Sequence, residues 1–248
     1  MGIGYLEKCA LRSKLQDKTG ARSARDRHSL PHLHGEGTMI DTILKNLEWL
    51  GHDAFRLTAG GKTIYFDPFQ LTGTHAAADY ILVTHSHFDH CSPDDIGKIM
   101  QESTVIITGA DCAAKLSGRR QTVKPGDTFT GESITIEAVR AYNTNKDFHP
   151  RKNNWLGFIV TVAGVRIYHA GDTDHIPEMA DIQADIALLP VSGTYVMTAV
   201  EAAEAALDIN PAVAVPMHFG SIVGKQTDAE LFAEKLANKI RVHIPTKK

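Results

Sequence analysis

The sequence predicts a mixed α and β protein, because short apolar runs of strand length alternate along the chain with signals for helix starts and hairpin turns. Its 248 residues are 43% hydrophobic and 22% charged, a composition that supports a sizeable folded core. The same composition excludes disordered, collagen-like and coiled-coil proteins. One large domain, or two small ones, fits this length.

The first 38 residues differ from the rest of the chain. They are rich in Arg, Lys, Ser, Gly and His and lack a sustained apolar periodicity. We expect residues 1–38 to be a disordered extension, or sequence translated upstream of a natural start at Met39. Residues 39–248 then form the folded domain.

Strand candidates follow in order along this domain. Residues 57–66 predict two strands joined at Ala59-Gly60-Gly61, and residues 158–169 predict a second hairpin that turns at Ala163-Gly164. Five further apolar runs have the length of buried strands: residues 80–84, 105–108, 134–139, 186–189 and 213–217.

Three helices are indicated by their first turns or their periodicity. Ser92 offers an N-cap, Pro93 suits the first helical position, and two aspartates follow that favour the helix dipole. Residues 198–201 form a capping box that opens an alanine-rich helix ending near Leu207. Residues 228–239 are amphipathic and predict the third helix.

Charge and cysteine content exclude several classes of protein. A net charge of −3 gives no global electrostatic signature of nucleic-acid binding. Three scattered cysteines are too few for a disulfide framework or a cysteine-rich zinc site, which favours a reducing compartment. No apolar run approaches the roughly 18 residues of a membrane span, and we expect a cytoplasmic protein.

The chemistry concentrates directly after the strand predicted at residues 80–84. In an extended segment His85 and His87 project to one side, while the turn that follows can aim Asp89 and His90 at an adjacent point. This is the geometry that two neighbouring metals need. Imidazole nitrogens with a carboxylate and no thiolate suit zinc, and manganese or iron less exclusively.

Two later groups follow the ends of other predicted strands. Asp172 comes after the second hairpin, with Gly171 permitting a close backbone approach, and His218 follows the strand at residues 213–217. Alone, each would usually be a surface or capping residue. Asp172 and His218 are expected to converge on one rim of the sheet together with residues 85–90, the histidine segment.

Taken in chain order, these residues form one pattern: His85-x-His87-x-Asp89-His90, Gly171-Asp172 and His218. The pattern resembles the signature of the metallo-beta-lactamase superfamily, and the resemblance covers residues 39–248. Further motifs are similar to its branch of metal-dependent hydrolases, which includes lactonases and N-acylphosphatidylethanolamine phospholipase-like proteins: Leu50-Gly51-His52, Asp67-Pro68, residues 168–173 and Met217-His218. The resemblance implies an αββα sandwich of two mixed sheets with the metals at one edge.

The resemblance also implies a ligand set for two divalent metals. The first metal takes two ligands from the histidine segment and one from the middle of the chain: His85, His87 and His149. The second takes Asp89, His90 and His218, with Asp172 bridging both metals. At His149 the sequence departs from the family, which commonly places this histidine at the end of the strand corresponding to residues 134–139; an ordinary loop histidine is the alternative reading. His149 is assigned because no other histidine lies between His90 and His169, and the polar stretch at residues 143–154 predicts a flexible loop able to reach the sheet edge.

Other polar residues are expected around these ligands. Asp67 resembles the family's aspartate at the end of an early strand, and we expect it to orient a ligand histidine or the histidine segment. His52, His169 and His175 are candidates for lining the site, with an ordinary histidine as the alternative reading of each. Ser192 lacks a Gly-x-Ser-x-Gly elbow and is not expected to be a nucleophile.

The implied reaction is hydrolysis. Two bound metals can lower the pKa of water from about 15.7 toward 7, which supplies hydroxide for attack on a carbonyl or phosphorus. Asp89 and Asp172 are the candidate catalytic carboxylates, with Asp172 or a nearby histidine handling the proton. We expect a small-molecule ester, lactone or phosphodiester substrate. The alternative is a metal-dependent binding or sensor protein on the same fold.

Overall fold

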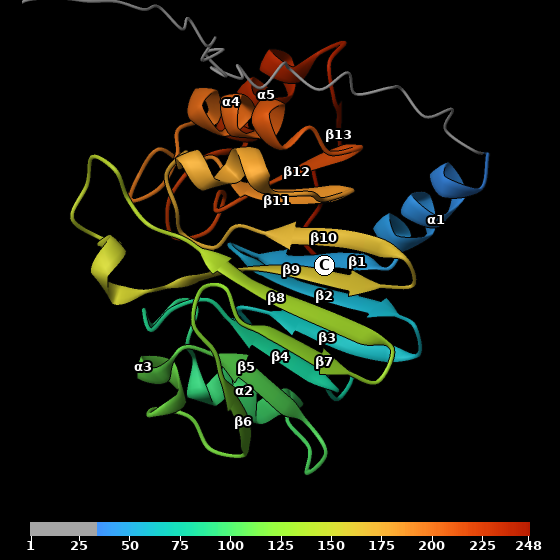
Figure 1. The fold of residues 1–248 in the computed structure, drawn as a ribbon, viewed down its shortest axis with the longest axis vertical. Coiled ribbons are helices and arrows are strands. Elements are labelled where there is room, and N and C mark those ends of the chain that lie inside the picture. Colours follow the sequence, from blue (N-terminus) through green and yellow to red (C-terminus); the bar gives the residue numbers. More distant parts are fainter. Residues whose placement is uncertain (1–33) are drawn as a thin grey trace, which may run out of the picture. The chain divides into compact units, whose positions relative to one another are not determined.

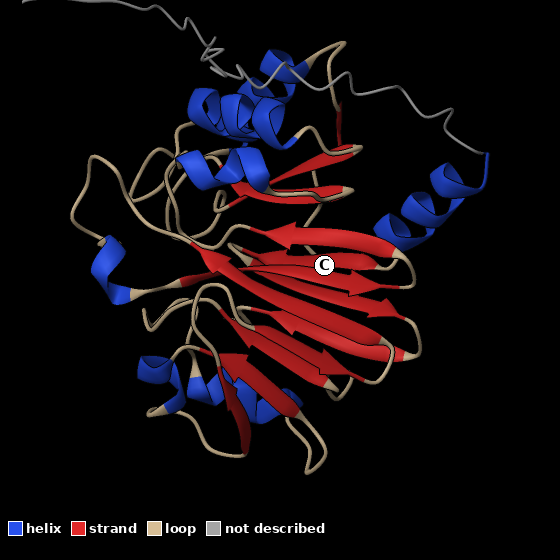
Figure 2. Ribbon diagram, viewed as in Figure 1, coloured by secondary structure: helices blue, strands red, loops and turns tan. Residues whose placement is uncertain are grey.

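The computed structural model describes residues 34–248, which fold around two mixed β-sheets (Figures 1 and 2). The first sheet contains, in spatial order, β1 (Leu47–Gly51), β2 (Ala54–Ala59), β3 (Lys62–Phe66), β4 (Tyr80–Val83), β5 (Val105–Thr108) and β6 (Arg119–Thr122). The second contains β13 (Arg241–Val242), β12 (Val213–Met217), β11 (Ile186–Pro190), β10 (Val165–His169), β9 (Leu156–Val162), β8 (Ile134–Arg140) and β7 (Thr128–Gly131).

Helices flank both sheets. Figure 1 shows α2 (Pro93–Ile99) and α3 (Ala110–Ala113) beside β5 and β6, whereas α4 (Ala199–Ile209) and α5 (Gln226–Leu236) lie beside β11 and β12. The remaining helices are α1 (His34–Lys45) and two short 3-10 helices, Arg151–Asn153 and Pro177–Asp181. The predicted αββα order of layers is confirmed.

Strand β4 shows how the layers pack. Tyr80 and Leu82 belong to the core between the two sheets, while Ile81 and Val83 belong to the core under α2 and α3. Successive side chains of a strand point to opposite faces, so a strand with a layer on each side is buried along its whole length. The continuous apolar run at residues 80–84 reflects this double burial.

Most of the strands and helices expected from the sequence are present. Both glycine-containing hairpins form, as β2–β3 and β9–β10, and the five apolar runs become β4, β5, β8, β11 and β12. Ser92 caps α2, and the Thr198 capping box opens α4. The sequence analysis did not predict β1, β6, β7, β13, α1 or α3; β6 is exposed at every residue and has no apolar pattern.

The predicted domain boundary at Met39 falls inside α1, which begins at His34. The expectation for residues 1–33 lies outside the described residues, and the division into an extension and a domain stays a prediction. No helix in the described part of the chain has the length and apolar character needed to cross a membrane.

The parallel strands position the candidate site. In the first sheet β3 pairs in parallel with β4, and in the second β10, β11 and β12 are parallel neighbours. The carboxyl ends of parallel strands meet at one edge of a sheet, where open α/β sheets usually bind ligands. Polar residues follow these strands in turn: Asp67 after β3, residues 84–90 after β4, Asp172 after β10, Ser192 after β11 and His218 after β12.

Candidate metal centre

One group of histidines gathers at the end of β4. His85, His87 and His149 each offer a nitrogen, and these nitrogens lie within 4.8 Å of one another. The Nε2 atom of His85 is 3.0 Å from Nδ1 of His87. His149 is almost fully buried although it comes from the polar loop between β8 and β9, so the structure brings it to the two histidines with which the sequence analysis grouped it.

The loop that carries His149 is held by hydrogen bonds. The carboxylate of Asp174 accepts from the backbone N–H of Thr144 at 2.8 Å and from the side-chain amide of Asn143 at 3.1 Å. Lys146 adds an ion pair to Asp174 at 2.6 Å. Asn143 in turn accepts from the backbone N–H of His149 at 2.9 Å. The loop therefore reaches the sheet edge in a fixed conformation.

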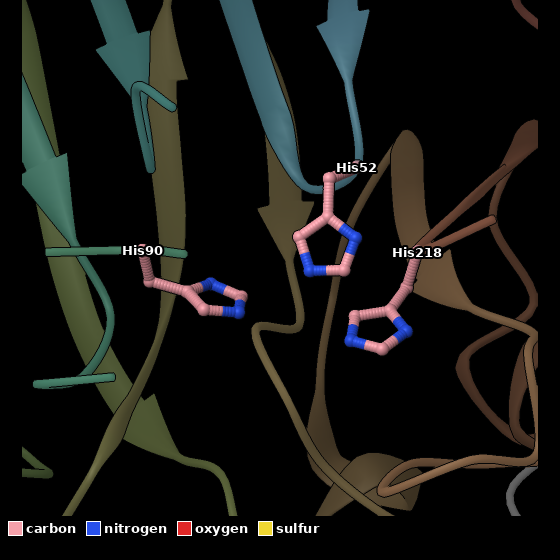
Figure 3. Close-up of side chains that lie close together, drawn as sticks. All are labelled: His52, His90 and His218. Atoms are coloured by element: carbon pink, nitrogen blue, oxygen red, sulfur yellow. The ribbon is translucent and has the colours of Figure 1, made fainter. Parts of the chain in front are cut away.

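A second group lies beside the first. Figure 3 shows the rings of His52, His90 and His218 facing one space, and their nitrogens lie within 4.8 Å of one another. His90 and His218 also form a group with two buried carboxylates, Asp53 and Asp172, and the candidate ligand atoms of this group likewise lie within 4.8 Å of one another. Neighbouring Asp89 approaches His52 Nε2 at 3.3 Å and His90 Nε2 at 4.0 Å.

Asp172 lies between the two groups. Its Oδ2 atom is 3.2 Å from His149 Nε2 and 3.9 Å from His85 Nε2, both in the first group. The same atom is 3.4 Å from His218 Nε2, and Oδ1 is 3.5 Å from His90 Nε2. One carboxylate thus faces nitrogens of both groups, the arrangement required of a bridging ligand.

Hydrogen bonds fix which nitrogen of each histidine faces the centre. Ser192 Oγ donates to the carbonyl of Thr194 at 3.1 Å, so it accepts from His218 Nδ1 at 2.8 Å. His90 Nδ1 donates to Asp67 at 2.8 Å. In both rings Nδ1 is engaged by these hydrogen bonds, so Nε2 is the nitrogen that faces the centre, as metal-binding histidines require.

The first group follows the same rule. His149 Nδ1 is 3.1 Å from Asn143 Oδ1, which can only accept, so Nε2 is again free. Thr84 Oγ1 donates to Asp67 at 2.7 Å and accepts from His85 Nδ1 at 3.0 Å. His85 Nε2 is therefore the nitrogen left toward the centre, and it faces His87 Nδ1.

Asp67 contacts residues of both groups. Its carboxylate accepts from His90, from the hydroxyl of Thr84 and from the backbone N–H of Thr84 at 2.8 Å. These contacts orient both His90 and the start of the histidine segment, as the sequence analysis expected of this aspartate.

The titration behaviour of the centre reflects its burial. Burial, followed by the charge of His90, lowers the pKa of His85 well below its usual value. Burial alone would also lower the pKa of His90, but Asp172 and Asp67 raise it well above the usual range. For Asp172 burial acts in the raising direction, yet His218 and His90 hold its pKa well below the usual value.

The other predicted lining residues differ in position. His52 lies in the second group, as described above. His169 donates from Nε2 to the carbonyl of Asp53 at 2.9 Å and accepts at Nδ1 from the N–H of Gly171, so it braces the centre and has no free nitrogen. His175 is not brought to the centre and pairs instead with Asp208 of α4 at 2.8 Å.

Several residues of the centre were missed in the sequence. Asp53, Asn143, Thr84 and Ser192 all contact the candidate ligands, but nothing in their spacing distinguishes them from ordinary loop or turn residues.

A cleft opens beside the first group. Its volume is about 640 Å³, within the range of small-molecule sites, and its lining includes Ser86, Lys124, Asn154 and Trp155. The ring of Trp155 lies 4.8 Å from the rings of both His85 and His87, so a residue of the cleft wall packs against two candidate ligands.

The donor set fits divalent metals. Within the described residues, buried atoms that face the centre and have no hydrogen-bond partner are both nitrogens of His52, both oxygens of Asp53, His90 Nε2, His149 Nε2 and Asp172 Oδ1. Buried polar atoms normally have partners, and such a convergence of lone pairs marks a cation site. The nitrogen and oxygen donors suit borderline and hard divalent ions.

A family model described as the Beta-lactamase superfamily domain matches residues 46–218. The chain belongs to this superfamily. Two UPF0173 metal-dependent hydrolases, from Thermoplasma acidophilum and Thermococcus kodakarensis, are 34% and 35% identical to it. The alignments cover 81% and 80% of this chain, respectively, and 95% of each relative.

Solved structures agree with this assignment. A crystal structure of a Parabacteroides distasonis protein classed as a metal-dependent hydrolase is 37% identical, with a TM-score of 0.73, and the match covers 80% of this chain and 91% of that one. A metallo hydrolase from Ignicoccus hospitalis is 25% identical with a TM-score of 0.67, covering 80% and 93%. The chain therefore groups with proteins named as metal-dependent hydrolases, and the superfamily predicted from the sequence is confirmed.

Proposed function

We propose that the chain is a dinuclear hydrolase of small-molecule esters, lactones or phosphodiesters. The first metal is held by His85, His87 and His149, and the second by Asp89, His90 and His218, with Asp172 shared. Zinc is the first candidate for the imidazole-rich site, with manganese or iron as alternatives. The position of Asp172 between the two groups is the observation that carries the proposal, because its two oxygens face nitrogens of both.

Each part of the site has a chemical task. Divalent metals supply a water of lowered pKa and neutralise the charge that develops on the attacked group. Hydrogen bonds hold the histidine rings in the orientations that leave one nitrogen toward the centre. Their partners are Ser192, Asp67, Asn143 and Thr84. Asp172 and Asp89 are the carboxylates able to accept a proton from the attacking water.

The cleft beside Trp155 is the proposed substrate pocket. Its polar lining, which includes Lys124 and Asn154, favours a substrate with charged or hydrogen-bonding groups. Exposed Phe88, inserted between the candidate ligands His87 and Asp89, offers an apolar contact at the mouth of the centre.

A hydrolysis screen of the metal-loaded protein tests the function. Lactone, phosphodiester, thioester and beta-lactam panels are compared for wild type and Asp172→Ala. Turnover of one class by wild type, lost in the variant, supports the proposal. A fully metallated wild type that binds ligands of these classes without turnover would contradict it and favour the sensor alternative.

A further inference from the structure

The turn between β1 and β2 is unusual for a hairpin. It consists of His52 and Asp53, which are 1% and 0% exposed. Two-residue hairpin turns favour Asn-Gly or similar pairs, and turns normally lie on the surface. His52 also has a positive φ of 52°, a conformation that costs energy for a non-glycine residue. The turn thus departs from the local preferences of its residues.

Neighbouring groups hold the backbone of this turn firmly. The carbonyl of His52 accepts from the indole of Trp49 at 2.8 Å and from the backbone N–H of His218 at 3.2 Å. The carbonyl of Asp53 accepts from His169 at 2.9 Å. Both carbonyls are therefore satisfied, and the position of the Asp53 side chain is set by these contacts.

The carboxylate of Asp53 has no such partners. Both of its oxygens are buried and make no hydrogen bond with any described residue. One oxygen lies 4.0 Å from His90 Nδ1, and the carboxylate belongs to the group with His90, Asp172 and His218 whose candidate ligand atoms lie within 4.8 Å. A buried carboxylate beside a second carboxylate is costly unless a cation lies with them.

We propose that Asp53 is an additional ligand of the second metal site. The inference rests on the proposed dinuclear centre. With Asp53, Asp89 and Asp172 the second site has three carboxylates beside His90 and His218, with the His52 ring next to them, whereas the first has three imidazoles and the shared carboxylate. Carboxylates suit ions such as Mn²⁺, which also take more ligands than tetrahedral zinc. The two sites therefore differ in metal preference, and the second selects an oxygen-preferring ion.

The test is a manganese titration. Metal-free protein receives one equivalent of zinc and is then titrated with Mn²⁺, with free Mn²⁺ followed by electron paramagnetic resonance. Wild type, Asp53→Asn and Asp95→Asn are compared. Asp95 is the matched control, because it is also a buried carboxylate but binds backbone N–H groups of residues 70 and 71, away from the centre.

We expect wild type and Asp95→Asn to bind one Mn²⁺, and Asp53→Asn to bind it about tenfold or more weakly. Unchanged Mn²⁺ affinity in Asp53→Asn would overturn the proposal, since the neutral asparagine amide lacks the negative charge that a carboxylate ligand supplies. A wild type that binds no Mn²⁺, but binds a second equivalent of zinc when that is supplied in its place, would overturn the metal preference. A wild type that binds no second ion would instead refute the dinuclear centre itself.

Unfolding of the metal-free proteins separates a ligand from a structural residue. Asp53→Asn replaces a buried carboxyl group that has no hydrogen-bond partner among the described residues, so the metal-free variant should unfold at the same or a higher denaturant concentration than wild type. A large loss of stability without metal would show that Asp53 serves the fold, and would overturn its assignment as a ligand.

Discussion

His149 Nε2 lies 3.2 Å from Asp172 Oδ2, although His149 precedes β9 and Asp172 follows β10. The two strands form an antiparallel hairpin, so the start of β9 and the end of β10 lie at the same edge of the sheet. The hairpin thereby brings a loop histidine to the carboxylate shared by both groups.

Replacement of His149 by alanine should weaken binding of the first metal by a factor of tens or more, because it removes one of three imidazoles. The metal content of the purified variant, measured by elemental analysis, should fall toward one ion per chain. His175→Ala is the control, since His175 contacts Asp208 away from the centre. A fully metallated His149→Ala protein with a near-normal catalytic rate would refute the assignment.

Ser192 is predicted to act on the second metal through His218. Its hydroxyl accepts from His218 Nδ1, so Ser192→Ala removes the group that fixes the ring and its tautomer. We expect metal affinity at that site to fall about 10- to 100-fold. Calorimetric titration measures it, with Ser221→Ala, a change on an exposed loop, as the control. Equal affinities in the two variants would contradict a positioning role for Ser192.

Gly171 permits the chain to pass close to β9 before Asp172. Its φ is +62°, and a Cβ there would lie 2.7 Å from the carbonyl of Leu156 and 3.1 Å from Thr84. Gly171→Ala should lower the free energy of unfolding by about 2 kcal/mol or more. Gly164→Ala isolates the backbone cost, because that glycine has a φ of +75° and open space around its Cβ. Denaturant unfolding measures both variants. Equal losses of unfolding free energy in Gly171→Ala and Gly164→Ala would contradict the predicted steric clash at residue 171.

The two sites should respond differently to acid. The raised pKa of His90 means that this ring carries a proton in the metal-free protein at neutral pH, and the second metal must displace it. His85 has a lowered pKa and is already neutral. As the pH falls from about 7 to about 5, the second metal should leave first. Metal content after dialysis should show a plateau near one ion per chain, and loss of both ions in one step would contradict this.

The sequence predicted the strands whose residues are buried on both faces, such as β4 and β12, because their composition alone requires burial. It could not predict β6, since Arg119–Thr122 is exposed throughout and depends on pairing with β5. Strand β1 was missed because its extended conformation depends on pairing with β2, which exists only in the folded sheet.

The candidate site was predictable where ligands are close in sequence, as in residues 85–90. Asp53 and Ser192 were not, because each gains its role from a residue far along the chain: Asp53 from Asp172 and His90, Ser192 from His218. Hydrogen-bond partners of ligands leave no spacing pattern, and tertiary packing alone brings them together.

The central claim is that Asp172 is shared by two metals. Elemental analysis of the purified wild type and of Asp172→Ala, each reconstituted with excess zinc and manganese and then desalted, measures this most directly. We expect about two ions per chain in wild type, since seven donors are too many for one tetrahedral site. In Asp172→Ala we expect occupancy of both sites to fall together. At most one ion per wild-type chain, or two retained ions in the variant, would contradict the account.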